Sequence, residues 1–296
     1  MLKIKNKHER DDNIIFIEEG HKYIINGDDS FISVTTYIHT HFKQFDSEII
    51  INKMKKSKNW KQSKYFGMTN YEIKKLWDDN GKNASSLGTK LHNDIEFFYN
   101  EIEIINDSIE WTYFKNFYNN NINKTPYRTE WTIYDENLKI CGSIDMIFIN
   151  DDGTLSIYDW KRCKEIKLKN DYNEYSVTPS IKHLHDCNYI HYTLQLNIYK
   201  KLIERNYGFT VKDLHIVCMH PDNDNNNYIE YKLPILNEEI DKLFQERLCL
   251  NNITEIEVTE KTYNDKIYFV DNKSNILDDD CNIIGLWKNE NDIILF

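Results

Sequence analysis

The chain has 296 residues, of which 40% are hydrophobic and 14% aromatic, so it can bury a sizeable core. Its formal net charge of −11 is unusual for a nucleic-acid-binding protein, so any attraction for phosphates has to come from local basic patches. The sequence contains no run of about 18 apolar residues and no signal-peptide pattern, so we expect an intracellular, non-secreted protein without a membrane span. The six cysteines include no C-x-x-C pair, which disfavours a zinc ribbon or an iron–sulfur cluster.

The N-terminal segment from Ile14 to Ile38 predicts short strands around a turn. The pair Asn26-Gly27 is a favoured hairpin turn, because both residues readily adopt positive φ angles. Thr35 and Thr36 are candidates for capping the short helix that follows.

Lysines dominate the next segment, which is also predicted to be helical from Asp46 onward. Between Asn52 and Lys75 there are eight lysines and one acid, Glu72. This local excess of positive charge is typical of a surface that contacts phosphates, and it is equally typical of a solvated lysine-rich helix. A second helix is predicted from Asn70 to Asn80, ending near Gly81.

A third helix is predicted after residues 84–86, since apolar residues recur at helical spacing from Leu87 to Phe98. His92 and Glu96 share another face of this helix, because residues four apart lie one above the other. A fourth, aromatic-rich helix is predicted from Ser108 to Tyr118.

The hydrophobic period then changes to that of strands. The remaining predicted elements are strands Thr129–Tyr134, Ile140–Ile149 and Leu155–Trp160, helix Tyr189–Asn206, strands Leu214–Met219 and Tyr228–Leu233, and helix Asn237–Leu250. This order predicts an α/β protein with a central mixed sheet flanked by helices and with N-terminal helical additions.

Two acids and a lysine stand out on the predicted strands. Asp145 lies inside one apolar strand and Asp159 near the end of the next, joined by an Asp/Gly turn. Carboxylates on neighbouring strands can converge, and their mutual repulsion favours a hard divalent cation such as Mg²⁺ or Mn²⁺. Lys161 follows Asp159 by two residues and therefore faces the same side of an extended strand, where it can hold a water or neutralise a phosphate.

The surrounding residues form four motifs in order. Gly142-Ser143-Ile144-Asp145 and Asp159-Trp160-Lys161 resemble motifs II and III of the RecB-like branch of the PD-(D/E)XK nucleases. Gly88 to His92 resembles the GxxxH helix of that branch, and Gln195 to Tyr199 resembles its QxxxY helix. The resemblance covers roughly Ala84 to Leu233. A weaker similarity, in His21-Lys22-Tyr23 and Ser33-Val34-Thr35, extends to viral, phage and mitochondrial genome maintenance exonucleases.

The resemblance implies a restriction-endonuclease-like core and a role for each matching residue. His92, Asp145 and Asp159 would bind Mg²⁺ or Mn²⁺ together with the backbone carbonyl of Trp160, and Lys161 would be the catalytic lysine. His92, Asp145, Asp159 and Lys161 are thus the expected catalytic set.

Further residues are expected around that set. The resemblance implies that Gln195 and Tyr199 contact the DNA strand or support the site. Glu130 and Glu96 are candidates for a supporting or second-metal role. Arg162 stands where relatives carry Thr or Ser, and it is a candidate for binding a phosphate.

The sequence therefore predicts a metal-dependent nuclease acting on single-stranded or free DNA ends in replication, repair or recombination. An RNA endonuclease of the cap-snatching type and a catalytically silent nucleic-acid-binding protein remain alternatives. No nucleotide cofactor is expected because a Walker A sequence is absent, so a helicase or replication protein would be a separate partner. The expected organisation is an N-terminal region at 1–83, a nuclease core at 84–250 and an acidic C-terminal extension at 251–296.

Overall fold

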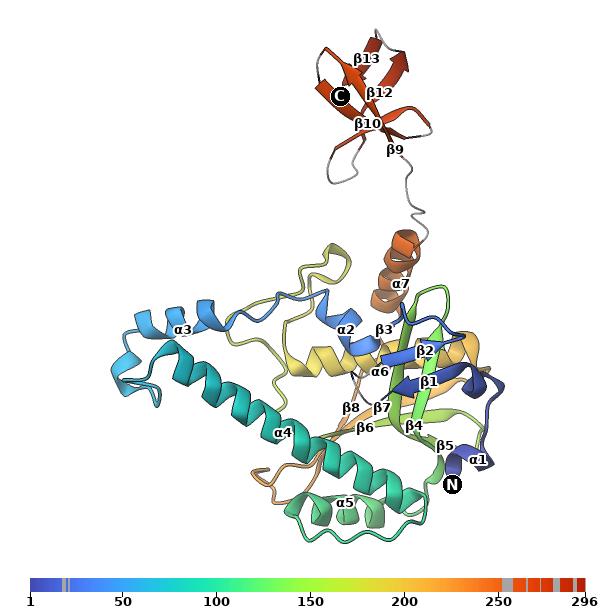
Figure 1. The fold of residues 1–296 in the computed structure, drawn as a ribbon. Helices are drawn as coiled ribbons and strands as arrows, with labels where there is room; N and C mark the ends of the chain where they lie inside the picture. Colours follow the sequence, from blue (N-terminus) through green and yellow to red (C-terminus); the bar gives the residue numbers. More distant parts are fainter. Residues whose placement is uncertain are drawn as a thin grey trace. The chain divides into compact units, whose positions relative to one another are not determined.

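The structure is a computed structural model that describes residues 1–17, 20, 22–251, 258–264, 266–271, 273–278, 283–289 and 292–295. It divides into two compact units, Met1–Phe244 and Gln245–Phe296 (Figure 1). The first unit holds residues 1–83 and most of residues 84–250, and the division between the units falls inside a helix. No helix in the described part of the chain is both long enough and apolar enough to cross a membrane.

A six-stranded sheet organises the first unit. Its strand order is β3-β5-β6-β7-β8, and β4 pairs with β5. The strands are β3 (Ile32–Ser33), β4 (Thr125–Asp135), β5 (Ile140–Ile149), β6 (Leu155–Lys161), β7 (Val211–Cys218) and β8 (Ile229–Lys232). The β3–β5 and β6–β7 pairs are parallel and the others antiparallel, which confirms the expected α/β class with a mixed central sheet.

Helices cover both faces of this sheet (Figure 1). The helices of the described chain are α1 (Leu2–Lys5), α2 (Val34–His39), α3 (Ser47–Lys56), α4 (Asn70–Tyr99), α5 (Ile109–Asn120), α6 (Asn188–Asn206) and α7 (Asn237–Asn251), and of these α3 does not lie on the sheet. The end of α4 and the aromatic face of α5 pack on β5 and β6, in a core that includes Leu91, Phe114 and Trp160. Helix α6 lies on the other face, where the Tyr199 ring rests against Gly142.

Two predicted helix boundaries were wrong. Helix α4 runs without interruption through Gly81 and residues 84–86, because one glycine costs a helix only about 1 kcal/mol and the flanking residues favour helix. The cap of α2 is Ser33, whose Oγ accepts a hydrogen bond from the Thr36 backbone N–H at 3.0 Å, rather than Thr35 or Thr36.

The predicted N-terminal hairpin turn is present in a modified form. Asn26 and Gly27 both adopt positive φ angles, and the turn is closed by a single bridge between Ile25 and Asp28. The longer hairpin pairs β1 (Ile14–Ile17) with β2 (Lys22–Ile25) instead. His21, part of the N-terminal resemblance, lies outside the described residues.

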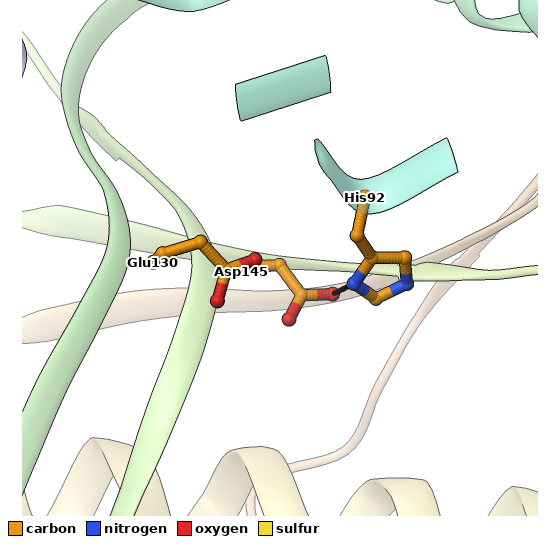
Figure 2. Close-up of side chains that lie close together, drawn as sticks. All are labelled: His92, Glu130 and Asp145. Atoms are coloured by element: carbon orange, nitrogen blue, oxygen red, sulfur yellow. Dashed lines mark ion pairs between the residues drawn. The ribbon is translucent and has the colours of Figure 1, made fainter. Parts of the chain in front are cut away.

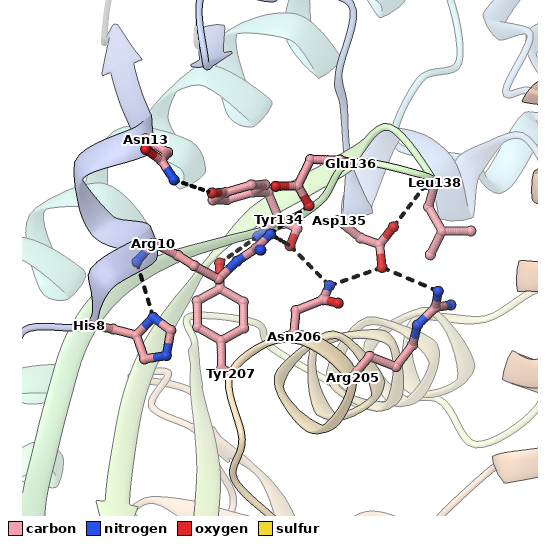
Figure 3. Close-up of polar contacts among 10 residues, drawn as sticks. All are labelled: His8, Arg10, Asn13, Tyr134, Asp135, Glu136, Leu138, Arg205, Asn206 and Tyr207. Atoms are coloured by element: carbon pink, nitrogen blue, oxygen red, sulfur yellow. Dashed lines mark hydrogen bonds and ion pairs between the residues drawn. The ribbon is translucent and has the colours of Figure 1, made fainter.

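Polar contacts fasten the N-terminal segment to the sheet (Figure 3). Arg10 donates hydrogen bonds to the Tyr134 carbonyl and, at 2.7 Å, to Glu136, and its guanidinium lies over the Tyr134 ring. The Tyr207 hydroxyl, just after α6, accepts from the backbone N–H of Tyr134 at 3.0 Å. The end of β4 is therefore held between the N-terminus and α6.

The second unit contains a five-stranded antiparallel sheet in the order β13-β12-β11-β10-β9. Its strands are β9 (Val258–Tyr263), β10 (Lys266–Asp271), β11 (Asn275–Leu277), β12 (Ile283–Asn289) and β13 (Asp292–Leu295). Val270, Ile276 and Trp287 form its small core.

Candidate metal centre

The candidate site lies where β5 and β6 begin to separate. Their pairing matches Met146 with Tyr158, and Asp145 and Asp159 are the next residues on the two strands. The charge of Asp145 contributes to the raised pKa of Asp159, so the two carboxylates lie close together. The backbone N–H of Trp160 donates a 2.8 Å hydrogen bond to Asp145 Oδ2, which fixes that carboxylate against β6. The predicted hairpin therefore does bring the two motif aspartates to neighbouring positions.

Three side chains converge at this point from α4, β4 and β5 (Figure 2). His92, Glu130 and Asp145 each offer one ligand atom, and these atoms all lie within 4.8 Å of one another. The His92 side chain is 26% exposed and that of Asp145 is 10% exposed, so the cluster borders solvent. The sequence predicted a supporting or second-metal role for Glu130, and in the structure Glu130 is one of the three possible ligands.

The backbone of β4 explains how Glu130 reaches this position. Glu130 has a φ angle of 43°, which is rare for a non-glycine residue within a strand. On either side of it, Thr129 accepts a hydrogen bond from Asn100 at the end of α4, whereas Trp131 packs against Tyr207 beyond α6. The regular alternation of the strand is therefore broken at Glu130, opposite Asp145 in the register.

His92 is oriented by the backbone of β6. Its Nε2 lies 2.8 Å from the Trp160 carbonyl oxygen, which can only accept, so Nε2 carries the hydrogen. Nδ1 is left facing Asp145 Oδ2 at 3.5 Å. This is the arrangement of a metal-binding histidine, whose second nitrogen is usually tied to a carbonyl or carboxylate. The Trp160 carbonyl, expected as a metal ligand, here accepts from His92.

Asp159 turns toward Lys161 rather than joining the three-residue cluster. Its Oδ2 lies 2.6 Å from Lys161 Nζ, and the Asp159 side chain is only 4% exposed. Lys161 Nζ also lies 4.7 Å from the centre of the Tyr192 ring on α6. The two residues do share one side of β6, as their spacing predicted.

Burial and crowding of like charges perturb the carboxylates. Burial, reinforced by the charge of Asp145, raises the pKa of Glu130 to about 8. Burial also raises the pKa of Asp159 to about 6, although Lys161 opposes this shift. Burial lowers the pKa of Lys161, but the charges of Asp159 and Asp145 outweigh it and raise this pKa above its usual value. The charges of Asp159 and Asp145 therefore keep Lys161 protonated.

Gln195 and Tyr199 of α6 lie against β5 at Gly142. Gln195 Nε2 donates to the Tyr199 hydroxyl at 3.3 Å, and burial raises the pKa of Tyr199 well above its usual value. A Cβ atom on Gly142 would lie 2.8 Å from the Tyr199 ring, so only glycine admits this packing. The two motif residues buttress β5, and Tyr199 is 3% exposed.

Arg162 and Glu96 take supporting positions. The Arg162 Nε donates a 2.6 Å hydrogen bond to Glu110 on α5, so its charge is already matched by an acid. Glu96 lies one turn after His92, and burial raises its pKa. Its charge also contributes to the raised pKa of Glu130.

Two contributing residues had not been assigned a role from the sequence. Ser143 Oγ donates a 2.9 Å hydrogen bond to Glu130, and Tyr192 lies against Lys161. Tyr192 precedes Gln195 and Tyr199 by three and seven residues, so helical spacing places all three on one face of α6 and could have identified it.

The donor set fits a hard divalent cation. Carboxylate oxygens and one imidazole nitrogen suit Mg²⁺, Mn²⁺ or related ions, and neighbouring carboxylates need positive charge to remain ionised together. The restrained His92 ring and the partly exposed cluster meet two further requirements of such a site, a fixed ligand and an entry path.

Comparisons with known proteins add little. No protein-family model matches the chain, and no curated protein matches it. A solved structure described as the crystal structure of SSO0001 is similar, with 17% identity and a TM-score of 0.34, over 76% of this chain and 78% of that chain. These values are too low to assign a fold or a function.

Proposed function

We propose that this chain is a metal-dependent nuclease that hydrolyses DNA phosphodiester bonds. The observation that carries the proposal is the convergence of His92, Glu130 and Asp145 beside the ion pair of Asp159 with Lys161. Of these residues, His92, Asp145, Asp159 and Lys161 belong to motifs that resemble the RecB-like branch of the PD-(D/E)XK nucleases, and this resemblance supports a restriction-endonuclease-like arrangement of the sheet and helices.

In this proposal the residues of the cluster divide the work. A divalent cation bound by His92, Asp145 and Glu130 or Asp159 would polarise the phosphate and lower the pKa of a bound water. Lys161 stays protonated, so it acts as a charge and a hydrogen-bond donor rather than as a base. Its Nζ, positioned by Asp159, stabilises negative charge that develops on the phosphate oxygens.

The motifs on α4 and α6 support DNA as the substrate. They also support an exonuclease activity on single strands or free ends in replication, repair or recombination. The helix that carries Gln195 and Tyr199 resembles the QxxxY helix of the RecB-like branch, and this resemblance favours the proposal over an RNA endonuclease of the cap-snatching type. Mg²⁺ or Mn²⁺ is the proposed cofactor, and no nucleotide cofactor is proposed.

Cleavage of end-labelled DNA tests the proposal. We expect cutting with Mg²⁺ or Mn²⁺, none with EDTA, and a loss of about 100-fold or more in Lys161→Ala. Lys115→Ala, which removes an exposed lysine of α5, is the matched control and should cut at the parental rate. If Lys161→Ala also cuts at that rate, the mechanism is wrong. Cutting of labelled RNA but not of DNA would replace the proposed substrate.

A further inference from the structure

The segment from Phe45 to Trp77, which we call the basic arm, stands away from the sheet (Figure 1). It comprises α3, a 3-10 turn (Trp60–Gln62) and the first turns of α4. Between Ile73 and Leu91 no residue of α4 is buried. This stretch of helix is therefore a solvated connection, and packing against the core does not explain why the arm is there.

The charge of the arm is opposite to that of the whole chain. Its eight lysines and three acids give 8 − 3 = +5, against −11 for all 296 residues. All three acids have internal contacts: Asp46 caps α3, Glu72 caps α4, and Glu48 pairs with Lys74 at 2.6 Å. The exposed lysines are Lys53, Lys56, Lys58, Lys61, Lys64 and Lys75. A polyanion is therefore attracted to the arm, whereas the remainder of the chain carries a net charge of −11 − 5 = −16.

Aromatic rings are exposed among these lysines. Phe45 is 71% exposed, Phe66 is 55% exposed and Tyr71 is 74% exposed. Phe45 lies 5.9 Å from Trp77, and Phe66 lies 6.1 Å from Trp60, measured between ring centres. Exposed rings interleaved with lysines are the pattern of proteins that stack unpaired bases while they contact the phosphates.

A pocket of about 350 Å³ lies between the arm and the loop before α6. Phe45, Lys53 and Ile49 line it from the arm, and Asn170 and His191 line it from the opposite wall. His191 is followed directly by Tyr192, whose ring contacts Lys161. None of the residues that line the pocket belongs to the candidate metal centre. The lining is aromatic and polar and includes the carboxylates of Asp46, Glu174 and Asp186, so it suits a nucleobase, whose N–H groups can donate to carboxylates, rather than a phosphate.

We propose that the basic arm binds single-stranded nucleic acid, with phosphates along the exposed lysines and one unstacked base in the pocket beside Phe45. A duplex fits less well, because its bases are stacked on one another and cannot reach the rings or the pocket. That the bound strand is the substrate rests on the proposed function, whereas the binding itself does not.

Fluorescence anisotropy of a short labelled oligonucleotide in EDTA tests the lysines without cleavage. Each phosphate contact on a single strand contributes about 0.7 to the salt dependence of binding, so Lys56→Ala/Lys58→Ala/Lys61→Ala should reduce the slope by about 2. The charge-matched control Lys5→Ala/Lys115→Ala/Lys242→Ala replaces three exposed lysines outside the arm and should keep the parental slope. Thermal melting monitored by circular dichroism checks that both variants are folded.

The ring is tested separately. Phe45→Ala should weaken binding to the single strand roughly tenfold, and Phe45→Tyr should restore it, because a tyrosine ring also stacks on a base. Binding of a duplex of the same sequence should be weaker and should not respond to Phe45→Ala. DNA and RNA strands in parallel assays show which sugar the site accepts.

The outcomes separate this inference from the proposed function. Binding that depends on the arm, without any metal-dependent cleavage, would support single-strand binding by the arm and refute the nuclease function. The reverse result is cleavage together with equal losses of affinity in the arm and control variants, or with tighter binding of the duplex. It would overturn single-strand binding by the arm and leave the nuclease function intact. An absence of binding by the parental protein would also overturn the arm.

Discussion

Strand β4 contributes one residue to each of two charged groups, and the groups differ in whether each acid is paired with a cation. Arg128 is 1% exposed and its Nη1 lies 2.7 Å from Asp11 Oδ2. Asp11 also accepts a 2.9 Å hydrogen bond from Trp131 Nε1. Two residues from Arg128, Glu130 faces other carboxylates, and Ser143 donates its one side-chain hydrogen bond among the described residues.

The pKa values show what this difference means. Burial of Asp11 works against ionisation, but the hydrogen bonds from Arg128, His8 and Trp131 prevail and lower its pKa. Burial and Asp145 instead raise the pKa of Glu130 to about 8. The first group is complete as a structural ion pair, whereas the second becomes favourable only when more positive charge arrives. Clusters of this second kind occur often at functional sites, and this one therefore supports the proposed metal centre.

Replacing Asp145 by Asn should separate activity from stability. We expect the cleavage rate to fall by about 1000-fold, since a ligand and its charge are lost, while the melting temperature stays at or above the parental value. The amide oxygen can still accept from the Trp160 backbone, and one source of repulsion is removed. Asp151→Asn, in the exposed turn between β5 and β6, is the matched control. If the melting temperature of Asp145→Asn falls while cleavage persists, Asp145 has a structural role and not a catalytic one.

Replacing Arg128 by Met should do the opposite. The variant leaves Asp11 buried without its cation, so the free energy of unfolding should fall by about 3–5 kcal/mol in urea denaturation. Adding Asp11→Asn to this variant should recover part of the loss. A loss below about 1 kcal/mol, the range of an exposed ion pair, would contradict the structural role of this group.

The pH dependence of stability should differ between the two groups. In metal-free protein, Glu130 keeps its proton up to a pH of about 8, whereas in the unfolded chain it releases the proton near the ordinary glutamate pKa of 4.5. Because the unfolded state then binds fewer protons, the free energy of unfolding falls as the pH rises through this window. Glu130→Gln carries no such proton, so its curve should be flatter there. If the free energy of unfolding changes with pH equally in the two proteins, Glu130 is not the group that titrates in this window.

Asp11 reverses that sign. Its lowered pKa means that its stabilising contribution is present above the unfolded pKa of 3.8 and is lost as the pH falls through the folded pKa. Urea denaturation of Asp11→Asn should therefore show a smaller loss of stability in acid than the parental protein shows. An identical acid transition in both proteins would mean that Asp11 is not the group responsible.

The strands that carry the site were predictable from local patterns. The apolar runs of β5 and β6 and the Asp/Gly turn between them suffice to place Asp145 near Asp159, and helical spacing suffices to place Gln195 and Tyr199 on one face of α6.

Other features depend on tertiary contacts that no local pattern contains. The left-handed φ of Glu130 and its convergence with His92 and Asp145 join residues of three separate elements, β4, α4 and β5. Gly81 predicts a helix end, but the helix-forming residues on both sides of it outweigh the cost of one glycine, so α4 is continuous.

Calorimetric titration with Mn²⁺ tests the central claim most directly, because it measures binding of a divalent cation and requires no substrate. We predict that the parental protein binds Mn²⁺, that Asp145→Asn loses this binding, and that Asp11→Asn keeps it. Absence of binding in the parental protein, or equal binding in Asp145→Asn, would contradict the assignment of His92, Glu130 and Asp145 as a metal centre.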